Sequence, residues 1–140
     1  MKKLATVVLL VVSACHRQTV GISGAPNARV AVDMFMAAGK AGDLDAMGRI
    51  WGSAAGPAIA TMGRNEREQR EVVMMRCMKH DRYQVLQEAT SAGRERVLLV
   101  ELRYKDLTAS TNFIATEGPG GKWYMKDFSL KDLERICVSM

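Results

Sequence analysis

The segment from Ala28 to Trp51 constrains the fold most, because its pattern predicts two short amphipathic helices that share one apolar side. Glycines at positions 39 and 42 can end the first helix, and Asp43 can cap the second by accepting a bond from a free backbone N–H group. The hairpin has no strand partner of its own, so its apolar side needs a sheet to cover. The residues at the three- and four-residue spacing of such helices are Val32, Phe35, Met36, Leu44, Met47 and Ile50.

The second half of the chain supplies that sheet, because its apolar period changes from helical to alternating after His80. Alternation is clearest where Leu98 and Val100 share one face of a strand and Val97 the other. Segments rich in β-branched and aromatic residues, joined by short turns, predict an antiparallel meander. The four expected strands are residues 82–90, 96–104, 108–116 and 122–128.

A third helix is expected to begin at Asn65. Asn65 can cap it while Glu68 bonds back in the manner of a capping box, and acidic residues near its start and basic residues near its end suit the helix dipole. The expected end lies around His80. Pro26 suits the first turn of the first helix, and residues 130–138 are expected to form a short closing helix or tail.

The first residues have the pattern of a targeting signal. Lys2 and Lys3 form a positive start, and the apolar run from Leu4 to Val12 is too short to span a bilayer as a helix. The run ends Val12-Ser13-Ala14-Cys15, which resembles the lipobox of bacterial lipoproteins, with valine at the position where leucine is usual. We therefore expect a signal peptide at 1–14, a flexible tether at 15–25 and a folded domain at 26–140.

This resemblance implies that Cys15 is lipidated and becomes the new N-terminus. Several acyl chains on one residue would anchor the chain stably, so we expect a location in the cell envelope, with the membrane as a partner through the lipid. Whether the inner or the outer membrane holds the anchor is left open. The alternative is a plain secretory peptide cut near Ala14, with Cys15 an ordinary thiol.

Export changes the meaning of the two remaining cysteines. Cys77 and Cys137 form an even pair in an oxidising compartment, which favours a disulfide that ties the third helix to the C-terminal tail. In the chain-entropy account, a loop of about 60 residues gives a bridge a stabilisation of about 4 kcal/mol. Two buried free thiols are the alternative.

The charge and the motifs argue against several classes of function. The formal net charge is +5, but Lys and Arg are interleaved with Glu and Asp throughout, which argues against a nucleic-acid partner. The sequence contains no zinc-type ligand spacing and no phosphate-binding glycine pattern before a helix. Met74, Met78 and His80 could hold Cu(I), although methionines that fill an irregular core are the more usual case. We expect no metal and no cofactor.

Two stretches carry a resemblance to a fold family. "AVDMFMAAGKAGDLDAMGRIWG" and "GPGGKWYMKDFSL" are similar to the opening helices and the last hairpin of nuclear transport factor 2-like, or cystatin-like, α+β domains. The resemblance covers the chain from Pro26 to the end. It implies helices packed on a curved four-stranded antiparallel sheet that encloses a cone-shaped cavity, and, in some members, dimerisation through the sheet. It does not fix a function.

Residues expected to line the cone are Phe35, Met47, Trp51, Tyr83, Tyr104, Phe113 and Trp123. Aromatic walls suit a small apolar molecule or a partner's side chain, and they suit a filled core equally well. We therefore expect a non-catalytic lipoprotein that binds a small apolar ligand or an envelope protein. The alternative is an isomerase- or dehydratase-type enzyme of this fold that uses Asp127 or Glu101 with a tyrosine.

Overall fold

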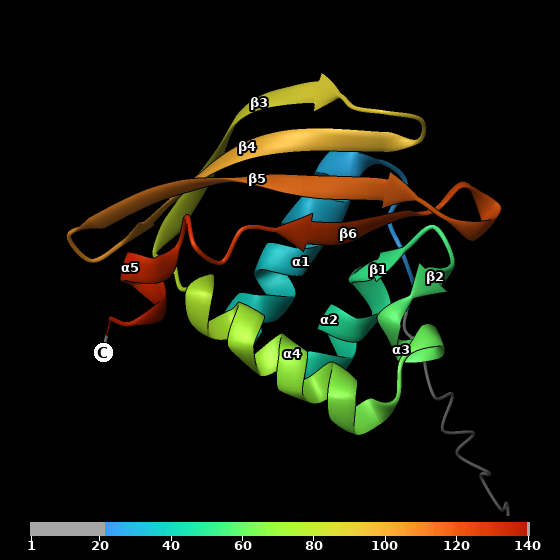
Figure 1. Ribbon diagram of the computed structural model, residues 1–140, viewed down its shortest axis with the longest axis horizontal. Coiled ribbons are helices and arrows are strands. Elements are labelled where there is room, and N and C mark those ends of the chain that lie inside the picture. The colour runs from blue at the N-terminus through green and yellow to red at the C-terminus, as the bar shows by residue number, and fades with distance from the viewer. Residues whose placement is uncertain (1–21, 140) are drawn as a thin grey trace, which may run out of the picture.

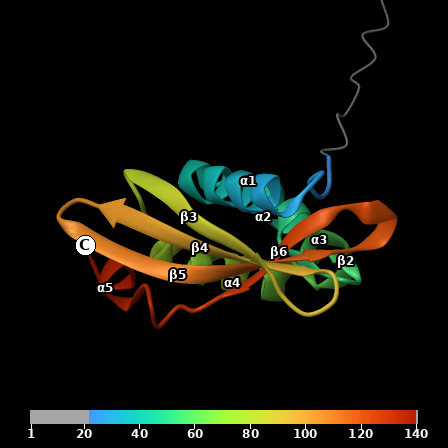
Figure 2. The ribbon, with the colours of Figure 1, turned by 90° about the horizontal axis from the view of Figure 1, so that it is seen from above.

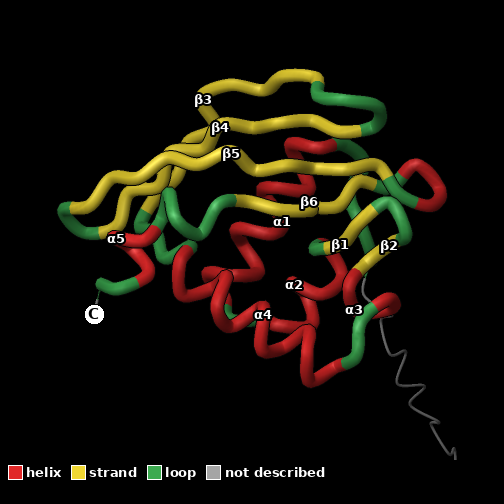
Figure 3. Tube along the Cα trace, in the orientation of Figure 1, coloured by secondary structure: helices red, strands yellow, loops and turns green. Residues whose placement is uncertain are grey.

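The computed structural model describes residues 22–139, so the expected signal peptide and Cys15 lie outside the described residues. Over this range the chain is an α+β fold, with N-terminal helices followed by a four-stranded antiparallel sheet that does not close on itself (Figure 1). The order of elements agrees with the prediction. In Figure 3 most of the helical segments lie to one side of the four long strands.

The predicted helical hairpin is present and is capped at both starts. Helix α1 (Ala28–Ala41) begins after Asn27, whose side chain accepts a bond from the Val30 N–H at 2.9 Å. It ends at Gly42, which has a left-handed backbone with φ of 69°. Helix α2 (Leu44–Ile50) is capped by Asp43, as the sequence predicts, through a 2.9 Å bond from the Ala46 N–H.

The connector is more ordered than the sequence suggests. Strands β1 (Gly52–Ser53) and β2 (Gly56–Pro57) pair antiparallel, and the short helix α3 (Ala58–Thr61) follows. Helix α4 (Arg64–Cys77) begins after Gly63, without a side-chain cap. The predicted cap at Asn65 is therefore wrong: Asn65 lies inside the helix, and Glu68 accepts a bond from Arg64 instead.

The four long strands lie in chain order and pair antiparallel, which confirms the predicted meander. Their predicted bounds are correct to within one residue. A 3₁₀ turn at Pro119–Gly121 joins the last two strands, and helix α5 (Glu134–Cys137) closes the chain. The strands are β3 (Arg82–Thr90), β4 (Glu95–Tyr104), β5 (Leu107–Glu117) and β6 (Trp123–Phe128).

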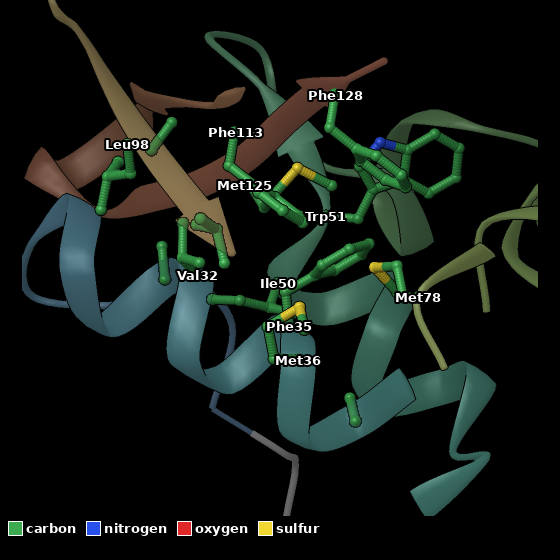
Figure 4. Close-up of a cluster of buried hydrophobic side chains, with 14 of the residues drawn as sticks. Val32, Phe35, Met36, Ile50, Trp51, Met78, Leu98, Phe113, Met125 and Phe128 are labelled. Carbon is green, nitrogen blue, oxygen red and sulfur yellow. The ribbon is translucent and has the colours of Figure 1, made fainter. Parts of the chain in front are cut away.

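The core lies between the helices and one face of the sheet, and α1 lies on that side of the sheet (Figure 2). Leu98, Val100 and Leu102 of β4 are fully buried, as their alternation predicts. Figure 4 shows side chains of α1, α2 and the strands meeting in this layer. Burial of this apolar area is the main term that holds helices and sheet together.

The folded part begins earlier than the predicted boundary at Pro26. Ala25 is fully buried and pairs with Trp123 of β6, with N–H to carbonyl distances of 2.9 and 2.8 Å. The Gly24 N–H donates to the carbonyl of Arg49 at 2.9 Å. The last two residues assigned to the flexible tether are therefore part of the domain, because the backbone there completes the edge of β6.

The predicted bridge between Cys77 and Cys137 is present. It joins the last residue of α4 to the last residue of α5 across a sequence separation of 60 residues. The C-terminal end of the domain is thus tied covalently to the end of α4.

Candidate functional site

The interior that the sequence assigns to a cone is filled by side chains. Phe35, Met47 and Phe113 are fully buried. The rings of Phe35 and Phe113 meet edge to face, with centroids 6.4 Å apart, and Phe128 stacks on Phe113 at 4.9 Å. Contacts of this kind are those of a close-packed core rather than of an open wall.

The remaining expected lining residues lie at the margin of this core and face different spaces. Trp51 lines a groove beside α4, Tyr104 lines a cavity at the C-terminal end of α4, and Tyr83 lines a hollow beside β3 and β4. Trp123 is half-buried, with the Arg96 guanidinium 5.5 Å from its ring centre. The seven residues therefore do not share one cavity.

The groove beside α4 has a volume of about 440 Å³. Gln69, Arg70 and Asp127 supply the polar part of its wall. This volume lies in the range of small-molecule sites, which are mainly apolar with a few polar groups. The apolar side chains that define what we call the apolar groove are Trp51, Val73, Met74, Phe128 and Leu130.

Local geometry fixes the aromatic wall of the groove. Trp51 ends α2 and bridges to Met125 of β6, so its backbone is held between helix and sheet. Its indole N–H donates to the Lys126 carbonyl at 3.3 Å. Val73 is 50% exposed on α4 and faces the same space. The groove thus combines a fixed aromatic side with an apolar side that water still reaches.

Two buried charged side chains hold α4 against α2. Arg67 Nη1 donates to the Leu44 carbonyl at 3.1 Å and to Glu71 Oε1 at 3.3 Å, and Nη2 lies 3.1 Å from Asp45. Gly48 makes room for this pair, because a Cβ atom there would lie 2.3 Å from Arg67 Nη1. Burial raises the pKa of Glu71 to about 7, against the lowering influence of Arg67.

Among the described residues, neither carboxylate proposed for catalysis is hydrogen-bonded to a tyrosine. Glu101 accepts a bond from Arg103 at 2.9 Å and lines the hollow beside β3 and β4 together with Tyr83. Asp127 lines the apolar groove, whose wall includes no tyrosine. The tyrosine that does bond a carboxylate is Tyr83, which donates to Asp33 at 2.7 Å. Burial, followed by this hydrogen bond, raises the pKa of Tyr83 to about 12, so its hydroxyl is a poor proton donor near neutral pH.

The methionine-rich segment has the structure of a packed helix end. Cys77 is bonded to Cys137, so its sulfur is not a thiolate, and Met78 is buried in the core. Within residues 22–139, no three His, Cys, Asp or Glu side chains come close enough together to hold a metal ion. The same described range contains no helix with the length and apolar character needed to span a membrane.

No protein-family model and no curated protein matches this chain. The inference of function therefore depends on the geometry of the cavities and on the sequence patterns themselves. Sequence reasoning did not find the apolar groove, because its wall is assembled from α2, α4 and the end of β6, segments that no local pattern connects.

Proposed function

We propose that this chain is a lipid-anchored protein of the bacterial cell envelope, whose domain is a non-catalytic binding module for a small apolar ligand. The apolar groove, rather than the filled interior, is the proposed binding site. The observation that carries this assignment is the groove of about 440 Å³ with Trp51 on one side and the exposed Val73 on the other.

The fold is compatible with the family resemblance, which does not by itself fix a function. Helices followed by a four-stranded antiparallel meander are compatible with a nuclear transport factor 2-like domain, and we propose that the chain belongs with these domains. The lipobox-like Val12-Ser13-Ala14-Cys15 supports the anchor. Dimerisation through the sheet stays a prediction of that resemblance.

A simple amphiphile tests the groove. Octanol has an eight-carbon chain that fits the volume, and we expect it to shift the indole N–H resonance of Trp51 in ¹⁵N–¹H spectra. Val73→Asp places a charge in the apolar wall and should weaken octanol binding by about tenfold, because an unpaired carboxylate there loses hydration when the ligand enters. Equal affinity in Val73→Asp and the parent protein would overturn the assignment to the groove.

Leu86→Asp is the matched control. Leu86 is 48% exposed on β3, against 50% for Val73, so the two substitutions expose a similar charge on the surface. Octanol affinity should be unchanged in this variant. If a protein partner's side chain is the natural occupant of the groove, the same two variants would separate in a pull-down from envelope extract, while octanol would compete with that partner.

The anchor is tested separately. Intact-mass analysis of membrane-extracted protein should show acyl chains on a chain that begins at Cys15, and Cys15→Ser should move the protein to the soluble fraction. An unmodified N-terminus would overturn the anchor and leave the groove proposal standing.

A further inference from the structure

A second cavity, at the C-terminal end of α4, is lined by basic side chains from two separate parts of the chain. Lys40 comes from the last turn of α1, and the other three come from the end of α4 and the residues that follow it. The cavity has a volume of about 410 Å³. The residues that define what we call the basic cavity are Lys40, Arg76, Lys79 and His80.

The hydrogen bonds of these cations leave their charge unneutralised. Lys40 donates to the Asp81 carbonyl at 3.3 Å, and Lys79 donates to the Ser139 carbonyl at 2.9 Å. Both acceptors are neutral backbone groups. Among the described residues, Arg76 has neither a hydrogen-bond partner nor an ion-pair partner on its side chain.

The His80 ring is oriented so that Nε2 makes no hydrogen bond within the described residues and stays in contact with solvent. Nδ1 lies 2.8 Å from the Met78 carbonyl, which accepts hydrogen bonds only, so Nδ1 carries the proton. The residue is 9% exposed, and its ring stands edge to face with Tyr83. Within the described part of the chain, every buried side-chain nitrogen has a partner, so the unbonded Nε2 retains contact with solvent.

Carboxylates are absent from the wall of this cavity as the described residues form it. The nearest carboxylate in the sequence, Asp81, accepts a bond from the Lys105 backbone N–H at 2.7 Å and so is held by the turn between β4 and β5. The negative ends of α1 and α4 favour cations here, by about 0.3–1 kcal/mol for each charge. That preference explains why each cation is placed at a helix end. It does not explain why Lys40, Arg76 and Lys79 line one hollow to which none of the described carboxylates contributes.

The floor of the basic cavity is apolar. Val72, Met75 and Met78 line it together with the ring of Tyr104. A hollow with an apolar floor and cationic side chains in its wall favours an anion that carries an apolar part, because the positive potential is focused inside it. Arginine adds a planar pair of donors that matches a carboxylate or phosphate.

We propose that the basic cavity is a binding site for a small organic anion with an apolar tail, such as a medium-chain carboxylate or a phosphate ester. The described chain begins beside β1 and β2, whereas this cavity lies at the other end of the molecule, near α5 (Figure 1). A membrane surface close to the N-terminus would therefore lie away from it. This placement favours a free anion over a lipid headgroup in the membrane that would hold the anchor.

Octanoate and octanol form the test pair, because they share a chain and differ in charge. Octanoate should shift the resonances of His80 and Tyr104, and Arg76→Gln should weaken its binding by about tenfold, the effect of one lost charge-assisted hydrogen bond. Arg64→Gln is the matched control, since it removes the same charge from the same helix at a position that lines neither cavity, where Arg64 is paired with Glu68. Octanoate affinity should be unchanged in Arg64→Gln.

Two results would overturn the proposal: equal weakening of octanoate by both arginine variants, or octanol displacing octanoate from the His80 site with similar affinity. Vesicles that contain phosphatidylglycerol separate the two sources of anion. Binding to vesicles that is lost in Arg76→Gln, together with no binding of free octanoate, would replace the free anion by a membrane headgroup. Neither result bears on the Val73 experiment, so this proposal and the function of the apolar groove fail independently.

Discussion

The apolar groove and the basic cavity are similar in volume, at about 440 and 410 Å³, but they differ in charge. Val73 faces the groove and Val72 faces the basic cavity, so neighbouring residues on α4 serve different spaces. The groove carries Arg70 and Asp127, one of each sign, whereas the basic cavity carries cations alone. The difference predicts that charge composition, rather than volume, separates the ligands proposed for the two sides of α4.

The largest expected effect comes from removing the bridge at the end of α4. The double variant Cys77→Ala/Cys137→Ala should lower the free energy of unfolding by about 4 kcal/mol, because the unfolded chain regains the freedom of a long loop. Urea denaturation measures this loss. Octanoate binding should weaken more than octanol binding, since the bridge lies beside the basic cavity. Equal weakening of both would show that the two sides of α4 move as one unit.

Glu71 gives the next effect, since it lies on the buried side of α4, against α2, and lines neither cavity. Its folded pKa of about 7 lies above the ordinary value of 4.5 for this carboxyl, so the unfolded chain releases the proton first as the pH rises. Its contribution to the free energy of unfolding should therefore be full below pH 4.5, fall between pH 4.5 and 7, and stay low above that. Each unit of pKa difference corresponds to about 1.4 kcal/mol.

Urea denaturation across this window, in the parent protein and in Glu71→Gln, measures that contribution as the difference between the two pH profiles. Glu71→Gln should remove the fall. A difference that instead grows in favour of the parent protein as the pH rises would contradict the raised pKa, and would mean that Arg67 keeps Glu71 ionised.

A reciprocal pair of substitutions tests the separation itself. Val72→Asp places a carboxylate among the cations and should weaken octanoate by about tenfold through lost charge complementarity, while octanol binding is retained. Val73→Asp should do the opposite. Both positions are exposed, at 41% and 50%, so neither variant should change the free energy of unfolding by more than about 0.5 kcal/mol. NMR titrations with octanoate and octanol measure the two affinities in each variant. Loss of octanol binding in Val72→Asp and of octanoate binding in Val73→Asp would contradict the assignment of the two ligands to the two cavities.

Salt gives the smallest expected effect. Raising the ionic strength should weaken octanoate binding gradually, because the cations of the basic cavity are partly exposed and are screened over about 10 Å at 0.1 M salt. Octanol binding in the groove should be constant or slightly stronger. An octanoate affinity that is independent of salt would show that its tail, and not its charge, selects the site.

Much of the fold was predictable because local pattern and tertiary structure agree. The alternation through Leu98 and Val100 fixed the buried face of β4, and Asp43 capped α2 as expected. The cap at Asn65 failed because Gly63 already supplies an extended residue at which the helix can start. The bridge between Cys77 and Cys137 followed from cysteine count and the expected export.

The sites were less predictable, since both are assembled from distant segments. Arg67 and Glu71 have the spacing of a solvated surface pair, and only the space left by Gly48 allows them to be buried. From the sequence, the helix dipole alone accounts for the basic residues Lys79 and His80 at the end of the third helix. The sequence does not show that they line one cavity with Lys40. Phe35 and Phe113, predicted to line a cone, instead fill it, because sequence pattern does not distinguish a wall from a packed interior.

The pairing of Ala25 with Trp123 also determines how this domain would carry load. Tension drawn along the chain ahead of Gly24 would first reach three backbone hydrogen bonds, one from Gly24 to Arg49 and two between Ala25 and Trp123, before it reached helix α1. Those hydrogen bonds would break first, while the end of the domain that carries the Cys77–Cys137 bridge stayed folded. A domain held by its front end in this way would project α5 outward.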